Sequence, residues 1–105
     1  MKNTLTSGQI RSIVFKEGST WYAVALELNI IESGNDPREV MLLLDEAIRG
    51  YLKSIRKAKL SDAVLNQKTD SDYEQLWSQI QTKKQPINSP LKVYSSASLM
   101  LPSFA

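Results

Sequence analysis

The strongest structural signal in this chain is the start of a helix at residue 37. Asp36 is a preferred N-cap residue, Pro37 suits the first helical position, and Glu39 completes an Asp-x-x-Glu capping box. Apolar residues then recur at three- and four-residue spacing as far as Ile55, which predicts an amphipathic helix ending near Lys57. Such a helix has to lay its apolar side on another element, so the rest of the chain must supply a surface.

Three short strands are predicted before this helix. Residues 10–15 and 21–28 are rich in β-branched and aromatic residues. The turn between them, residues 16–20, contains Gly18, which is free to take a positive φ. A third strand, residues 30–33, ends at the next glycine.

The two faces of residues 21–28 differ in character. Tyr22, Val24, Leu26 and Leu28 share one fully apolar face, which is predicted to face the main core. The opposite face carries Trp21, Ala23, Ala25 and Glu27 and is half apolar. We therefore expect that second face to be partly covered, either by another part of the chain or by a second copy of the protein.

Two further elements follow the long helix. Residues 59–69 read as a looser segment, and Ser71 to Glu74 forms a second capping-box pattern at the start of a shorter helix. Pro86 and Pro90 bracket a linker, and residues 91–101 are strand-like. The order strand-strand-strand-helix-helix-strand predicts an α+β fold, in which one long amphipathic helix packs on one face of a small antiparallel sheet. At 105 residues, positions 1–105 make one domain.

The amino-acid composition, and the positions of the acidic residues, argue against most kinds of catalytic site. The chain has no histidine and no cysteine, which excludes Ser-His and Cys-His catalysis, disulfides and cysteine-based zinc sites. A two-metal nuclease needs clustered carboxylates, yet residues 10–15 contain no acid. Asp45 and Glu46 point about 100° apart on the long helix, and they are interpreted as surface partners of Arg49 rather than as metal ligands. We expect no enzyme activity, no catalytic or metal-binding residue and no cofactor.

The charge pattern offers one basic cluster, from Lys53 to Lys59, in a chain of net charge +2. It could bind nucleic-acid phosphates or an acidic partner, or it could be a solvated helix end stabilised by the helix dipole. The second interpretation is favoured, because no aromatic residues are interleaved for base stacking. No direct DNA binding is expected. Since no signal peptide and no membrane-length apolar run is present, we expect a cytoplasmic protein without a membrane partner.

Residues 10–52 resemble the HicB-type antitoxin domain. The matching features are a first strand, a turn, Trp-x-Ala-x-x-x-Glu-Leu, a Ser-Gly strand end and Ala-Ile-x-x-Tyr-Leu closing a helix. In this chain they are Trp21, Ala23, Glu27, Leu28, Ser33, Gly34, Glu39, Val40, Ala47, Ile48, Tyr51 and Leu52. The resemblance implies a partial ribonuclease-H-like fold and an antitoxin that binds and masks a small RNA-cleaving toxin, as a dimer or larger oligomer.

The chain departs from that family in two places. Full antitoxins of the family usually carry a C-terminal DNA-binding module, whereas a strand-like tail, about residues 91–101, follows the second helix here. About residues 59–88 form a helical insertion before that last strand. Both departures weaken the transfer of a DNA-binding, autoregulatory role.

Two functional hypotheses remain open at this point. The first is a non-enzymatic HicB-like protein-binding module that forms a homo-oligomer, a dimer or tetramer, and masks a small toxin. The alternative is a stand-alone structural or regulatory oligomer that kept the fold and lost toxin and DNA binding. The candidate partner-interface residues are Trp21, Ala23, Leu42, Arg49 and Lys53. Trp21 could be an interface anchor or a residue covered by the helix that contains Trp77.

Overall fold

A computed structural model describes residues 2–81 and 92–101 of the chain. The fold is α+β, with a four-stranded antiparallel sheet and two α-helices. The elements in chain order are β1 (Gly8–Glu17), β2 (Thr20–Ala25), β3 (Ile30–Gly34), α1 (Pro37–Ala58), the 3-10 turn η1 (Asp62–Leu65), α2 (Ser71–Gln81) and β4 (Lys92–Leu101). The predicted linker at Pro86 and Pro90 lies outside the described residues.

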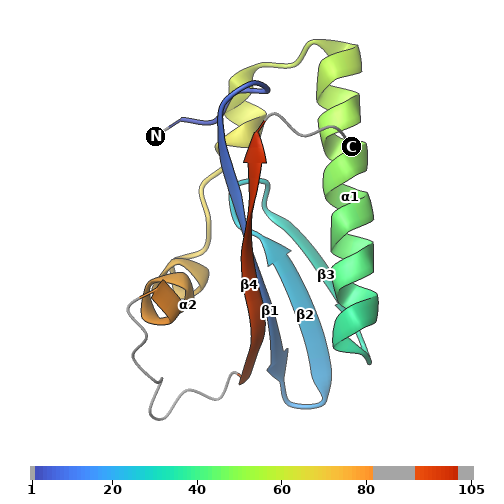
Figure 1. Ribbon diagram of the computed structural model, residues 1–105, viewed down its shortest axis with the longest axis vertical. Coiled ribbons are helices and arrows are strands. Elements are labelled where there is room, and N and C mark those ends of the chain that lie inside the picture. The colour runs from blue at the N-terminus through green and yellow to red at the C-terminus, as the bar shows by residue number, and fades with distance from the viewer. Residues whose placement is uncertain (1, 82–91, 102–105) are drawn as a thin grey trace.

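The sheet has the strand order β3-β2-β1-β4, so the last strand pairs with the first (Figure 1). β1 and β2 form a hairpin whose loop is Gly18 and Ser19, and Gly18 has the positive φ (63°) that this loop was predicted to need. β4 forms one edge of the sheet and pairs with β1 over almost the full length of both strands. The predicted C-terminal strand is therefore confirmed, and it lies at an edge of the sheet.

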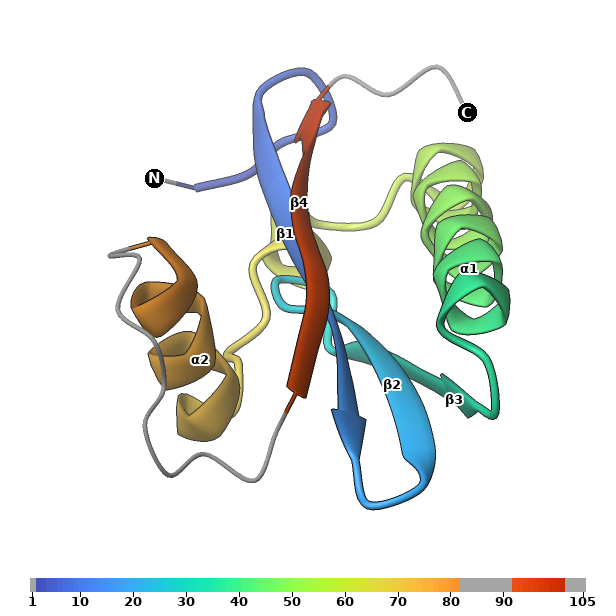
Figure 2. The same ribbon diagram turned by 60° about the horizontal axis from the view of Figure 1, so that its bottom comes forward.

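The two helices lie on opposite faces of the sheet (Figure 2). α1 packs over β2 and β3, where its buried residues meet Ala23 and Ala25. α2 covers the other face, where Leu76 packs on Ile13 and Val24. Each sheet face thus packs against a helix of the same chain.

Tyr22, Val24, Leu26 and Leu28 were predicted to face the main core, which lies under the long helix α1. For three of the four residues this prediction was wrong. Tyr22, Val24 and Leu26 face α2, and of that set only Leu28 belongs to the core under α1. The physical reason is size. Alanine side chains let a helix approach the sheet closely, so the alanine face suits the long helix although it offers less apolar area. The face that carries Trp21, Ala23 and Ala25 is covered by α1, and no second copy of the protein is needed to bury the two alanines.

The start and end of α1 follow the predicted signals. Asp36 accepts a hydrogen bond from the Arg38 backbone N–H (2.8 Å) and Pro37 is the first helical residue. At the other end Lys59 takes the left-handed conformation and its backbone N–H donates to the Ile55 carbonyl. Neither helix in the described ranges combines the length and apolarity that a membrane span requires.

The cap of α2 differs from the prediction. The side chain of Asp70, rather than Ser71, accepts the hydrogen bond from a first-turn backbone N–H, that of Asp72 (2.8 Å). The Glu74 carboxylate, expected to reach back to the helix start, instead binds Arg11 on β1. The segment expected to be loose also contains an ordered turn, η1, whose Leu65 is fully buried.

The N-terminal segment is held to the sheet by two asparagine side chains. The amide of Asn3 accepts from the Gln9 backbone N–H (2.8 Å) and donates to the Gln9 carbonyl (2.8 Å), so it pairs as a neighbouring strand would. The amide of Asn66 pairs in the same way with the backbone of Asn3, at 2.6 and 2.9 Å. Asn3 also donates to the carbonyl of Leu65, which links this segment to η1.

Candidate functional site

Three of the five predicted interface residues lie along one line of α1. Leu42, Arg49 and Lys53 fall within an arc of about 40° on a helix of 3.6 residues per turn. All three are exposed, and the Leu42 side chain is 65% exposed. Arg49 forms the expected surface ion pair with Asp45 (3.0 Å). This outer face of α1, defined by Leu42, Arg49 and Lys53, is a solvent-facing surface with one large apolar side chain.

The other two predicted interface residues lie on the opposite side of that helix. Ala23 is 0% exposed under α1, so the prediction that it contacts a partner was wrong. The β-strand period places Trp21 and Ala23 on the same sheet face, the one under α1, and Ala23 is the more deeply buried of the two. The five residues therefore do not form one surface.

Trp21 is half-buried and packs against the core under α1, not against α2. The suggestion that the Trp77 helix covers it was wrong. Its indole makes an edge-to-face contact with Tyr94 of β4 (5.7 Å between ring centroids), and the ammonium of Lys16 lies 5.7 Å from the ring. Trp21 thus joins β2 to the start of β4 across β1, so a charged substitution there would disturb the fold as well as any interface.

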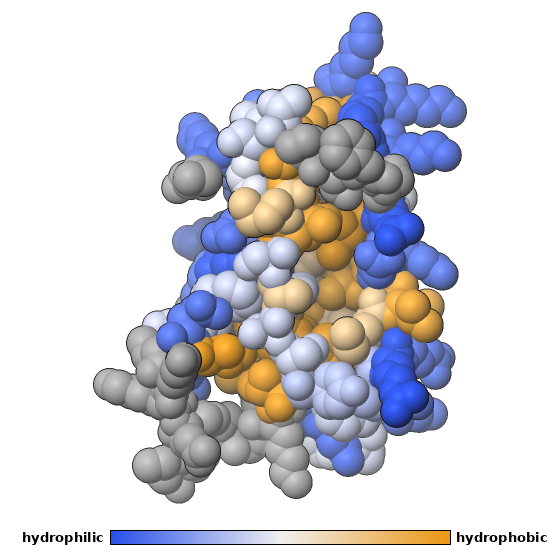
Figure 3. Space-filling model, in the orientation of Figure 1, coloured by the Kyte–Doolittle hydropathy of each residue, from blue (hydrophilic) through white to orange (hydrophobic). Residues whose placement is uncertain are grey.

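An apolar band accompanies β4. Seven large apolar side chains are exposed among the described residues, and four of them lie on both sides of this edge strand. Tyr94 and Met41 are on the α1 side, where Tyr94 meets Trp21 and the Met41 sulfur lies 4.0 Å from the Ser95 hydroxyl. Val93 and Met100 are on the α2 side, where Val93 lies opposite Phe15 and Met100 lines the pocket described below. Figure 3 shows hydrophobic residues gathered between β4 and α1 on this side of the molecule. Clustering of this kind marks an interaction surface more often than scattered single residues do. The sequence signal for it was the absence of any charged residue from Val93 to Leu101.

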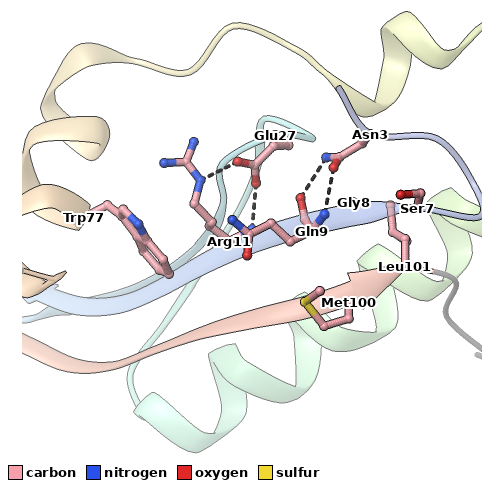
Figure 4. A pocket seen from close by; sticks show the side chains of 9 residues that line it. All are labelled: Asn3, Ser7, Gly8, Gln9, Arg11, Glu27, Trp77, Met100 and Leu101. Carbon is pink, nitrogen blue, oxygen red and sulfur yellow. Dashed lines mark hydrogen bonds and ion pairs between the residues drawn. The ribbon is translucent and has the colours of Figure 1, made fainter. Parts of the chain in front are cut away.

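On the other face of the sheet, a pocket of about 620 Å³ lies between the N-terminal segment, β1, β4 and α2 (Figure 4). Its polar centre is Arg11, which binds two carboxylates. The guanidinium forms an ion pair with Glu27 and a two-pronged hydrogen bond with Glu74 (2.7 and 2.8 Å). It also lies over the ring of Trp77, 5.6 Å from the centroid.

Arg11 acts in this structure as a clamp between β1, the turn that follows β2, and α2. Its backbone N–H donates to Glu27 as well (2.6 Å), so the glutamate that matches the family pattern serves a structural contact here. The hydrogen bond from Arg11 holds the pKa of Glu74 below the ordinary value of a glutamate, and the same bond raises the pKa of Arg11. Because the pKa of Glu74 is lower in the folded state, the Arg11–Glu74 interaction stabilises the fold fully when the pH is above the unfolded-state pKa of Glu74. This stabilisation is lost as the pH falls from there through the lower, folded-state pKa. A lone arginine in an apolar strand was the missed sequence signal.

Replacing Arg11 by methionine should lower the free energy of unfolding by about 1.5–3 kcal/mol, because it removes charge-assisted hydrogen bonds and leaves the partly buried Glu27 carboxylate without its cation. Adding Glu27→Gln should recover part of the loss, since the amide oxygen can still accept from the Arg11 backbone N–H. Urea unfolding of both variants measures this. If Arg11→Met alone unfolds like the wild-type chain, the clamp does not stabilise the fold.

The structure adds two observations on nuclease chemistry and nucleic-acid binding. Within residues 2–81 and 92–101, no three side chains of the types that ligate metals come together. Asp45 and Glu46 are exposed on α1 and Asp45 pairs with Arg49. The basic cluster from Lys53 to Lys59 is exposed at the C-terminal end of α1, where Arg56 and Lys57 lie in the last turn. There the positive charges complement the helix dipole.

No family model, no curated protein and no solved structure matches the chain. The HicB resemblance therefore rests on the motif residues between positions 10 and 52.

Proposed function

We propose that this chain is a non-enzymatic, protein-binding module of the HicB antitoxin type, which self-associates and masks a small RNA-cleaving toxin. The observation that carries the proposal is the pairing of a motif pattern with two separate exposed surfaces. These are the outer face of α1 and the apolar band along β4. A module that binds itself and a different protein needs two such surfaces.

The polar centre of the pocket supports a binding role less well. Both oxygens of Glu74 and one oxygen of Glu27 already hold the Arg11 guanidinium, so that cation is committed within the chain. A ligand carboxylate or phosphate would have to displace one of these glutamates. Protein surfaces, rather than a ligand pocket, are therefore the basis of the proposal.

The alternative function is a stand-alone structural or regulatory oligomer without toxin or DNA binding. It is favoured by one observation: residues 92–101, which follow α2, complete the sheet as β4. The antitoxins that the chain resembles usually carry a C-terminal DNA-binding module, whereas α2 and β4 both pack on the sheet here. The two functions share self-association and differ in the second partner.

The test uses the product of the reading frame adjacent to this gene, where it encodes a small basic protein. Expressed alone, that product should stop growth and degrade RNA, and co-expression of this chain should restore both. Leu42→Glu should weaken the complex by about tenfold or more, measured by calorimetry, because it places a charge at the one large aliphatic anchor of the outer face of α1.

Leu60→Glu is the matched control. Leu60 is also a half-exposed leucine, but it follows the end of α1 and lies off the line of Leu42. Its substitution should leave the affinity unchanged. A chain that neither restores growth nor binds the neighbouring product would favour the stand-alone oligomer. Equal losses in the two variants would move the toxin surface away from the outer face of α1.

A further inference from the structure

The outer edge of β4 has backbone groups whose direction can be worked out from the neighbouring strands. In an antiparallel sheet the N–H and C=O of one residue point to the same neighbour, and consecutive residues alternate. The carbonyl of Arg11 accepts from the Leu26 N–H (2.9 Å), so Arg11 points its groups toward the β2 side. Ser12 and Val14 consequently point theirs toward β4.

The same alternation can be followed across to β4. Ser12 is opposite Ala97, and Val14 is opposite Ser95. Ala97 and Ser95 therefore direct their backbone groups toward β1. Ser96 and Ser98, which lie between and beside them, direct theirs away from the sheet. Their N–H and C=O groups form a ladder without a neighbouring strand among the described residues.

Beyond its first residues, this edge lacks the features by which proteins keep edge strands apart. Charged residues, prolines and very short length are the usual protections. β4 is ten residues long, and from Val93 to Leu101 it contains no charge and no proline. Its one irregularity, a bulge between Ser95 and Val93 opposite Val14 and Phe15, lies near one end and leaves the stretch from Ser95 to Leu101 in regular register.

We propose that the β4 edge pairs with β4 of a second copy of this chain, antiparallel and about a two-fold axis, so that two sheets become one. Ala97 lies on the axis, opposite the partner's Ala97, and Ser96 lies opposite the partner's Ser98. In this register the outward-pointing Ser96 and Ser98 exchange hydrogen bonds, and Ala97 forms the non-hydrogen-bonded pair, where the Cα atoms approach to about 4.5 Å. The small side chains at the seam suit that close approach.

A second copy fits this edge better than an unrelated strand does. The pairing is self-complementary, because a two-fold axis presents the same uncharged, small-residue stretch from both sides. The net charge of +2 per chain opposes association only weakly. The inference rests on the self-association in the proposed function and assigns it a surface. It replaces the sheet face of Trp21, Ala23 and Ala25, from which self-association was first expected, since α1 covers that face.

Charge pairs placed at the seam test the register. Sedimentation of the wild-type 105-residue chain at micromolar concentration should show a dimer. Ser96→Lys combined with Ser98→Lys places like charges opposite each other at two places, and we expect it to raise the dissociation constant by about tenfold or more. Ser96→Lys combined with Ser98→Glu places opposite charges at the same two places. It should remain a dimer and become sensitive to salt.

Proline variants separate the seam from the fold. Ser98→Pro removes an outward N–H and should give a monomer with a normal melting curve, because proline is tolerated at an open edge. Ala97→Pro removes an N–H that faces β1 and should lower the melting temperature.

Each contrary outcome has a distinct meaning. A wild-type chain that is monomeric at all concentrations overturns both the seam and the self-association in the proposed function, while toxin binding is judged by its own assay. If the wild-type chain is a dimer and the Lys/Lys variant dimerises equally well, this pairing is overturned. It is also overturned if the Lys/Glu variant is a monomer. In both cases the self-association in the proposed function still holds.

Discussion

Replacing Gly8 by alanine should lower the free energy of unfolding by about 3–5 kcal/mol, a large part of the stability of a domain of this size. A Cβ atom at this position would lie 2.0 Å from Oδ1 of Asn3, and the backbone has a φ of +122°, which side chains rarely adopt. The amide of Asn3 would have to leave its place, and three hydrogen bonds with Gln9 and Leu65 would be lost.

Gly50 provides the matched control for this change. It lies in α1, it is exposed, and no heavy atom outside its own helical turn lies within 4 Å of the added Cβ. Gly50→Ala should therefore stabilise the protein by about 0.5–1 kcal/mol, the difference in helix propensity. Thermal unfolding of both variants gives the comparison. A Gly8→Ala protein that melts within a degree or two of the wild type would mean that Asn3 does not anchor the N-terminal segment.

Truncating Leu52 to alanine should cost about 2–5 kcal/mol. Leu52 is 1% exposed in the core between α1 and the sheet, so its removal loses buried apolar area and leaves a cavity. Leu42→Ala, on the opposite side of the same helix, should change the stability by less than about 0.5 kcal/mol. Urea denaturation at one protein concentration compares the two leucines. Equal losses would contradict the orientation of α1.

The elements that local residue patterns define were predictable. The cap at Asp36, the proline at the first helical position and the regular apolar spacing place α1 within a residue or so of its observed ends. The glycine of the β1–β2 hairpin and the break at Gly34 predict the existence and order of the first three strands, although β1 extends two residues beyond its predicted range at each end and β2 stops at Ala25, three residues before its predicted end. These signals act over a few neighbouring residues, so the sequence displays them directly.

The packing of the faces could not be predicted in the same way. The period of β2 separates Tyr22 and Val24 from Ala23 and Ala25, but it does not say which helix covers which set. Apolar area alone suggested that the larger side chains face the long helix. The closeness of α1 to the sheet depends instead on the small side chains of Ala23 and Ala25, a property of the packed pair rather than of either element.

The polar contacts of Asn3 and Arg11 could not be predicted from the sequence for a different reason. Asn3 binds Leu65 and Asn66, and Arg11 binds Glu74, across more than sixty residues of chain. No local spacing connects such partners. The two candidate surfaces differ in the same respect: one depends on local spacing and the other on contacts distant in sequence. Helical period places Leu42, Arg49 and Lys53 together, whereas the edge position of β4 requires the strand order of the sheet.

The strand order also determines when each strand can pair during synthesis. Ser12 of β1 cannot pair with Ala97 of β4 until the ribosome has added a further 85 residues. At about 5–20 residues per second, this interval is roughly 4–17 s. During that time β2, β3 and both helices can assemble around a first strand whose other side is bare. The nascent chain therefore passes through a state whose open edge belongs to the apolar β1, and neighbouring nascent copies on one messenger could meet there before β4 arrives.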